Sequence, residues 1–128
     1  MATVSSFRDL RVWQTAIQLA TDVYQLSGDL PANDHSDLAA NLQRTVVIIP
    51  TLIASGHKSG QITVLRSHCM EAVRRADELE TLLVICGELH PAVPSNDILD
   101  TLEDVRQSLM TVITRLTPQA KKKPAKAI

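Results

Sequence analysis

Aromatic residues are almost absent from this chain, which has one Phe, one Trp and one Tyr among 128 residues. Because β-sheet proteins rely on aromatic and β-branched pairs across neighbouring strands, this scarcity disfavours an all-β fold. Gly and Pro are also few, at four and six residues, while 45% of the residues are apolar. A chain of this length and composition is long enough to bury a single hydrophobic core, and packed helices tolerate its composition best.

Cysteines and long hydrophobic runs are scarce as well. Cys69 and Cys86 are the only cysteines, and we predict that both lie in one helix, about 25 Å apart and too distant for a disulfide. The longest uncharged apolar run, Thr45–Gly56, is shorter than the ~20 residues that a membrane span requires. No signal-peptide pattern opens the chain. We therefore expect a cytoplasmic protein without a membrane partner.

Catalytic constellations are missing too. The four His residues are dispersed along the chain, and His68 and Cys69 are adjacent, so on a helix they diverge by about 100° and do not share a metal. No Glu is followed three residues later by a His, as a di-metal helical bundle requires. The stretch Gly56–Gly60 lacks the residue order of a phosphate loop. We predict no enzyme activity, no cofactor and no metal site.

The chain instead shows helical periodicity in four segments separated by turn-forming residues. We expect helices from Ser6 to Gly28, from His35 or Ser36 to Gly56, from Ser59 or Gln61 to Cys86, and from Ser95 or Asn96 to Leu116. Short connections between helices favour antiparallel neighbours. The sequence therefore predicts an all-α, antiparallel up-down four-helix bundle over residues 1–118, followed by a disordered basic tail over residues 119–128.

The third and second segments differ in how clearly they read as helices. The third has one unbroken apolar seam at steps of three and four residues: Ile62, Leu65, Cys69, Ala72, Ala76, Leu79, Leu83 and Cys86. The second is apolar all round over residues 46–54, and its β-branched residues resemble a strand. We favour a helix kinked at Pro50, because no partner strand exists elsewhere in the chain.

The first segment has two adjacent apolar stripes rather than one. Val12, Ala16, Leu19, Val23 and Leu26 form one, and Leu10, Trp13, Ile17, Ala20 and Tyr24 form the other. One bundle cannot cover both stripes together with the apolar second segment, so we expect a homo-oligomer. The alternative is a monomer with scattered exposed aliphatic side chains.

The net charge of −1 hides a segregation of charge along the sequence. Residues 38–75 contain five basic residues against Glu71 alone: Arg44, Lys58, Arg66, Arg74 and Arg75. One interpretation is a phosphate-contacting face for RNA, DNA or an acidic partner. The other is a bundle whose basic helix surfaces lie beside acidic ones.

Several motifs together suggest a known family. Residues 7–14 read Phe-Arg-Asp-Leu-Arg-Val-Trp-Gln, residues 49–54 contain Ile-Pro followed by Ile-Ala, and residues 78–81 read Glu-Leu-Glu-Thr. In these positions the chain resembles the four-helix-bundle family first noticed in intervening sequences of bacterial large-subunit rRNA genes. The likeness covers about residues 6–116. It departs from the family where Ile48, Leu52 and Ser55 replace the usual Ser, Asn and Glu, and where Arg74 and Arg75 replace Gly-Ser.

This resemblance implies a ring-like homo-oligomer, commonly a pentamer. Relatives include accessory proteins of diversity-generating retroelements, which are basic pentamers that bind a reverse transcriptase and nucleic acid. We therefore expect a non-enzymatic accessory protein that binds nucleic acid, or a ribonucleoprotein or reverse transcriptase partner. Its phosphate contacts would be Arg44, Lys58, Arg66, Arg74 and Arg75. The alternative is a protein-binding oligomeric scaffold with no nucleic-acid function.

Overall fold

A computed structural model describes residues 6–32 and 37–118 of the chain. It contains a short 3-10 turn, η1 (Phe7–Asp9), and four α-helices: α1 (Arg11–Gly28), α2 (Leu38–Lys58), α3 (Ile62–Leu89) and α4 (Asn96–Leu116). These residues include no β-strand, which confirms the all-α prediction. The predicted disordered tail, residues 119–128, lies outside the described residues.

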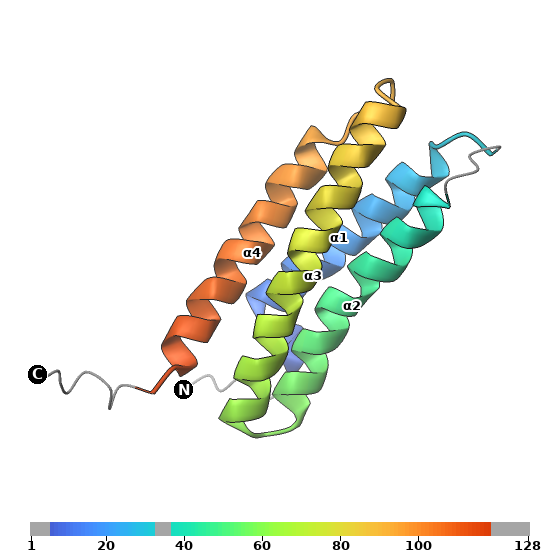
Figure 1. Ribbon diagram of the computed structural model, residues 1–128. Helices are drawn as coiled ribbons and strands as arrows, with labels where there is room; N and C mark the ends of the chain where they lie inside the picture. Colours follow the sequence, from blue (N-terminus) through green and yellow to red (C-terminus); the bar gives the residue numbers. More distant parts are fainter. Residues whose placement is uncertain (1–5, 33–36, 119–128) are drawn as a thin grey trace, which may run out of the picture.

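The four helices form a bundle (Figure 1). Each helix packs against the next one along the chain, and α1 also packs against α4, which closes the bundle. The end of α1, the start of α2 and the α3–α4 connection lie at one end of the bundle, and the α2–α3 connection lies at the other. Residues far apart in the sequence are therefore gathered at each end.

The core is one continuous apolar cluster to which all four helices contribute. On α1 and α2 the buried side chains recur every three or four residues: Val12, Ala16, Leu19, Val23 and Leu26, which are the first predicted stripe of α1, then Leu38, Leu42, Val46, Ile49 and Ile53. Full burial of each large aliphatic side chain stabilises the fold by about 1.5–3 kcal/mol. The second stripe of α1 is half-buried or exposed, so only the first stripe belongs to the core.

The start of the first helix was predicted too early. Ser6 caps η1 rather than α1, because its Oγ accepts a hydrogen bond from the Arg8 N–H at 3.1 Å. Leu10 is extended, with φ −76° and ψ 124°, and separates η1 from α1. This break brings the Phe7 ring against the Trp13 ring edge to face, with centroids 5.2 Å apart. Packing of these two rings stabilises the break, which local periodicity does not reveal.

The apolar second segment is helical, as expected, and Pro50 lies inside it. Proline has no N–H to donate to the Val46 carbonyl, yet the helix continues on both sides of it. By length and composition, α2 is the one helix in the described part of the chain that passes for a membrane span. Eight of its residues are buried against the rest of the bundle. These buried residues account for part of its apolar character.

Two expectations for the third helix were wrong. The helix runs through Gly87 to Leu89 instead of ending at Cys86. The buried seam begins only at Cys69, because Ile62 is 63% exposed and Leu65 is half-buried. The first turns of α3 lie at the end of the bundle, where Leu65 packs against the edge of the core. The fourth helix has the predicted bounds, and Ile98, Leu102, Val105 and Leu109 are its buried residues.

Candidate nucleic-acid and subunit interfaces

The structure separates the five basic residues that the sequence grouped together. Lys58 ends α2 and Arg66 lies near the start of α3, so both stand at the end of the bundle that contains the α2–α3 connection. Arg44, Arg74 and Arg75 lie in the interior turns of α2 and α3. A single phosphate-contacting face built from all five residues is therefore not present in one bundle.

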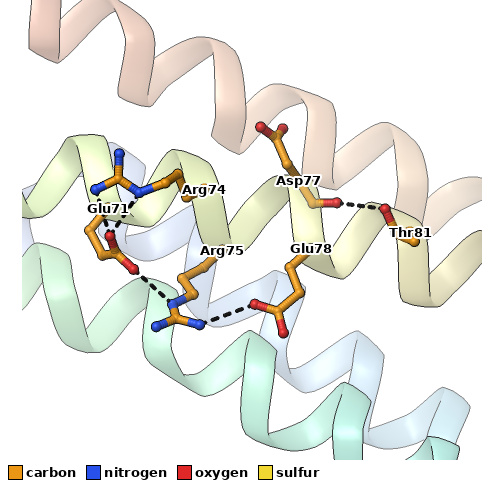
Figure 2. Close-up of polar contacts among 6 residues, drawn as sticks. All are labelled: Glu71, Arg74, Arg75, Asp77, Glu78 and Thr81. Carbon is orange, nitrogen blue, oxygen red and sulfur yellow. Dashed lines mark hydrogen bonds and ion pairs between the residues drawn. The ribbon is translucent and has the colours of Figure 1, made fainter.

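Arg74 and Arg75 are also paired with carboxylates of their own helix (Figure 2). One oxygen of Glu71 accepts hydrogen bonds from Arg74 at 2.7 and 2.9 Å. The other oxygen of Glu71 lies 3.0 Å from Arg75 Nε, and Arg75 also reaches Glu78 at 3.1 Å. These contacts offset most of the positive charge at the middle of α3.

The pairing with Arg74 and Arg75 also affects the pKa of Glu71. Hydrogen bonding from Arg74 lowers this pKa below its usual range, with further lowering by the charges of Arg74 and Arg75. Glu71 therefore remains ionised at neutral pH and continues to offset the two arginines. On α2, Arg44 is exposed and donates a hydrogen bond to the side-chain oxygen of Asn41.

The end of the bundle that holds Lys58 and Arg66 gathers more cations than the sequence suggested. Its described charged residues include a single carboxylate, Asp9, against five basic residues: Arg8, Arg11, Lys58, Arg66 and Arg115. We call this end the basic pole. Three of these residues were missed because they lie in segments of net negative charge, and only the fold brings them beside Lys58 and Arg66.

Local contacts hold parts of the basic pole in place. Arg66 Nε donates a hydrogen bond to Thr117 Oγ1 at 3.1 Å, and that hydroxyl donates to the Ile113 carbonyl at 2.7 Å. This chain of contacts ties the start of α3 to the end of α4. A pocket of about 260 Å³ at this end is lined by Ser6, Phe7, His57 and Lys58. A phosphate group is an anion of suitable charge for such a surface.

The opposite end of the bundle is acidic. Within four residues of a helix end, its charged residues in the described part of the chain are all carboxylates: Asp29, Asp37, Glu88, Asp97 and Asp100. The first cations met from this end, Arg44 and Arg106, lie in interior turns of α2 and α4. We call this end the acidic pole. The two ends of the bundle therefore carry opposite charge, and the net charge of −1 also includes four lysines of residues 119–128, which lie outside the described residues.

A third surface lies between α1 and α2 and is apolar. A groove of about 600 Å³ is lined by ten residues: Phe7, Trp13, Ile17, Ala20, Val47, Pro50, Thr51, Ala54, Ser55 and Lys58. Lys58 is its only charged residue. Ile17 and Val47 are 38% and 41% exposed, although both are large aliphatic side chains. We call this surface the α1–α2 groove.

Charge is sparse on the two helices that form the groove. Helix α1 contains only Arg11 and Asp22, and α2 contains only Arg44 and Lys58 beside His57. All three aromatic residues of the chain lie in η1 or α1. Few charges together with aromatic residues are typical of the centre of a protein–protein interface.

No group of three or more His, Cys, Asp or Glu residues in the described ranges is placed to hold a metal ion. Cys69 and Cys86 are both buried. Burial raises the pKa of the Cys69 thiol to about 11. Because the thiolate is the reactive form, Cys69 is a packed core residue and not a nucleophile at neutral pH.

Comparison with known proteins yields one family. A family model described as 23S rRNA-intervening sequence protein matches residues 8–114. No curated protein and no solved structure shows significant similarity to the chain. The matched range includes all four helices except the last two residues of α4, so it leaves out Arg115 of the basic pole and Phe7 of the α1–α2 groove.

Proposed function

Because this chain belongs to the 23S rRNA-intervening sequence protein family, we propose that it is a non-enzymatic, homo-oligomeric accessory protein of the cytoplasm. It binds nucleic acid, or a ribonucleoprotein or reverse transcriptase partner, through the basic pole. The positions of the helix ends support an antiparallel up-down bundle, and we infer a ring-like assembly, with a pentamer as the expected form.

The basic pole is the observation that carries this proposal. Five cations from five different elements meet at one end of the bundle, with Asp9 as the only described carboxylate among them. Phosphate contacts by Lys and Arg dominate nucleic-acid affinity and require no sequence-specific groove. Repetition of the pole around an oligomer multiplies a modest charge into a strong field.

Lys58 and Arg66 remain phosphate contacts in this proposal, and Arg8, Arg11 and Arg115 join them. Arg44, Arg74 and Arg75 become secondary contacts. Arg74 and Arg75 share Glu71 as an ion-pair partner, so a phosphate group would have to compete with that carboxylate. Arg44 lies away from the pole, in the interior turns of α2.

A salt titration with a fluorescently labelled single-stranded RNA tests the proposal. Each phosphate contact contributes about −0.7 to the slope of log affinity against log salt. We expect the Arg115→Gln variant to bind more weakly at low salt and to lose roughly one contact from this slope. Arg106→Gln is the matched control, because Arg106 lies on the same helix and is paired with Asp77 at 2.9 Å.

Two results would contradict the nucleic-acid role. One is an affinity that does not change with salt, and the other is no binding even at low salt. Equal losses in Arg115→Gln and Arg106→Gln would show that the pole has no special part in binding.

The alternative function is a protein-binding oligomeric scaffold. The sparse charge and the aromatic residues of the α1–α2 groove favour it. If the chain assembles but shows no RNA binding at low salt, the scaffold is the better description.

A further inference from the structure

We propose that the α1–α2 groove of one copy binds the outer face of α3 of a second copy, near its acidic pole. This inference rests on the homo-oligomer in the proposed function and specifies which two surfaces meet. The two surfaces are different parts of the same chain, so the contact is heterologous.

On α2, the side that lines the groove has a cation near each end and uncharged residues between them. Along α2 the residues at successive steps of three or four are Arg44, Val47, Thr51, Ser55 and Lys58. Of these, Val47, Thr51, Ser55 and Lys58 line the groove, and Trp13 and Ile17 form the facing wall. Its occupant must therefore be apolar in the middle and acidic at the flanks.

The chain itself contains such a surface at the end of α3. Val84, Ile85 and Leu89 are 50%, 42% and 54% exposed within two turns of that helix. Glu80 and Glu88 lie four residues before and after Val84, so the three side chains follow one line on the helix. We call this surface the α3 stripe. Arg106 of α4 lies near enough to interact electrostatically with Glu80 at one end of this stripe.

Charge favours groove-to-stripe contact over the alternatives. Contact between two grooves would bring Arg44 and Lys58 of both copies together, and contact between two stripes would do the same with Glu80 and Glu88. Like charges opposed in an interface cost affinity, whereas complementary charges select the register. Groove-to-stripe contact covers both exposed apolar surfaces and places the acids of the stripe beside a groove whose only charged lining residue is a lysine.

A heterologous contact of this kind has a structural consequence. Each copy keeps one free groove or one free stripe after it has bound a neighbour, so growth continues until the ring closes. Because each contact uses one groove and one stripe, two variants that each damage one of these surfaces test the inference. Both changes fall on exposed side chains, so the bundle itself is expected to remain folded.

The groove variant is Val47→Asp, which places a carboxylate opposite Glu80 and Glu88 of the neighbour. The stripe variant combines Val84→Asp with Ile85→Asp, which removes the apolar centre of the stripe. Met110→Asp is the matched control, because Met110 is 41% exposed on α4 and belongs to neither surface. Circular dichroism checks that all variants keep their helical content.

Sedimentation velocity gives the readout. We expect the wild type and Met110→Asp to form the same oligomer, and each surface variant alone to sediment as a monomer of 14.0 kDa. An equimolar mixture of the two surface variants is expected to form a dimer and nothing larger. In that mixture one copy supplies an intact groove and the other supplies an intact stripe.

Each contrary outcome has its own meaning. If either surface variant assembles like the wild type, or if the mixture forms no dimer, groove-to-stripe contact is wrong. A monomeric wild type overturns both the contact and the oligomer, while the RNA titration still tests the basic pole. If the mixed dimer forms but RNA binding is absent, the contact stands and the nucleic-acid role falls.

Discussion

Gly56 determines how closely α2 and α3 approach each other at the basic pole. A Cβ atom added at this position would lie 3.0 Å from Leu65 Cα and 3.1 Å from His68 Cβ. Both neighbours are at or next to the backbone of α3, so neither can swing aside as the end of a long side chain would. The helices must separate locally before a larger residue fits.

We therefore expect Gly56→Ala to lower the free energy of unfolding by about 1–2 kcal/mol, since overpacking outweighs the gain in helix propensity. Gly28→Ala is the matched control, because a Cβ there meets nothing within 4 Å. That variant is expected to be unchanged or more stable by roughly 0.5 kcal/mol. Urea unfolding measures both, and a fully stable Gly56→Ala protein would show that the close approach is not a constraint.

Cys69 makes stability depend on pH in the alkaline range. Burial raises the pKa of its thiol from 9.0 to about 11. The unfolded chain therefore loses this proton at a lower pH than the folded chain does. The stabilisation is complete below pH 9 and is lost as the pH rises to 11.

We expect the free energy of unfolding to fall by roughly 2–3 kcal/mol across that interval because of Cys69. Comparison with Cys69→Ala isolates this contribution from the other groups that titrate there. If the two proteins lose stability in parallel between pH 9 and pH 11, the thiol is not protected from ionisation in the folded state.

At the scale of the helices, the sequence predicts well which segments are helical and which faces are buried. It predicts the residues at which the helices begin and end less well. The buried stripe of α1 is one of the two stripes that the sequence predicts, because a helix inside a bundle repeats its apolar residues with the period of the helix. The break at Leu10 was missed, since it depends on contact between Phe7 and Trp13. The continuation of α3 through Gly87 was missed as well, because packing against α4 overrides the weak helix propensity of glycine.

The seam of α3 offers a direct comparison of sequence and structure. Periodicity places Ile62 and Leu79 in the same seam, whereas the structure leaves Ile62 63% exposed and buries Leu79 completely. We expect Leu79→Ala to lower the free energy of unfolding by about 2–5 kcal/mol through the cavity it leaves. Ile62→Ala is expected to change it by less than about 0.5 kcal/mol. Equal losses in the free energy of unfolding would show that Ile62 belongs to the buried seam, as the periodicity predicts.

At the scale of the whole molecule, the sequence did not predict which cations the fold gathers at one end. It grouped Lys58 and Arg66 with Arg74 and Arg75, which pair with Glu71 and Glu78. Proximity in sequence indicated a basic middle segment. Proximity in space follows instead from which helix ends meet, and those ends bring Arg8 and Arg115 to the same pole.

The single tryptophan reports on assembly of the whole molecule. Trp13 lines the α1–α2 groove, so a second copy bound there would shield it from water. We expect the Val47→Asp monomer to fluoresce at longer wavelength than the wild-type oligomer and to be quenched more readily by acrylamide. The Met110→Asp control is expected to match the wild type. Identical spectra and quenching in the monomer and the oligomer would place the subunit contact elsewhere.

The separation of the two poles gives the molecule a large electric dipole moment along the bundle axis, although its net charge is only −1. In solution, the force between two such bodies depends on how each is turned and not only on how far apart they are. The same protein should adsorb to a cation exchanger by one end and to an anion exchanger by the other. Near its sequence pI of about 6.4, orientation and not net charge then decides what the molecule approaches and with which face.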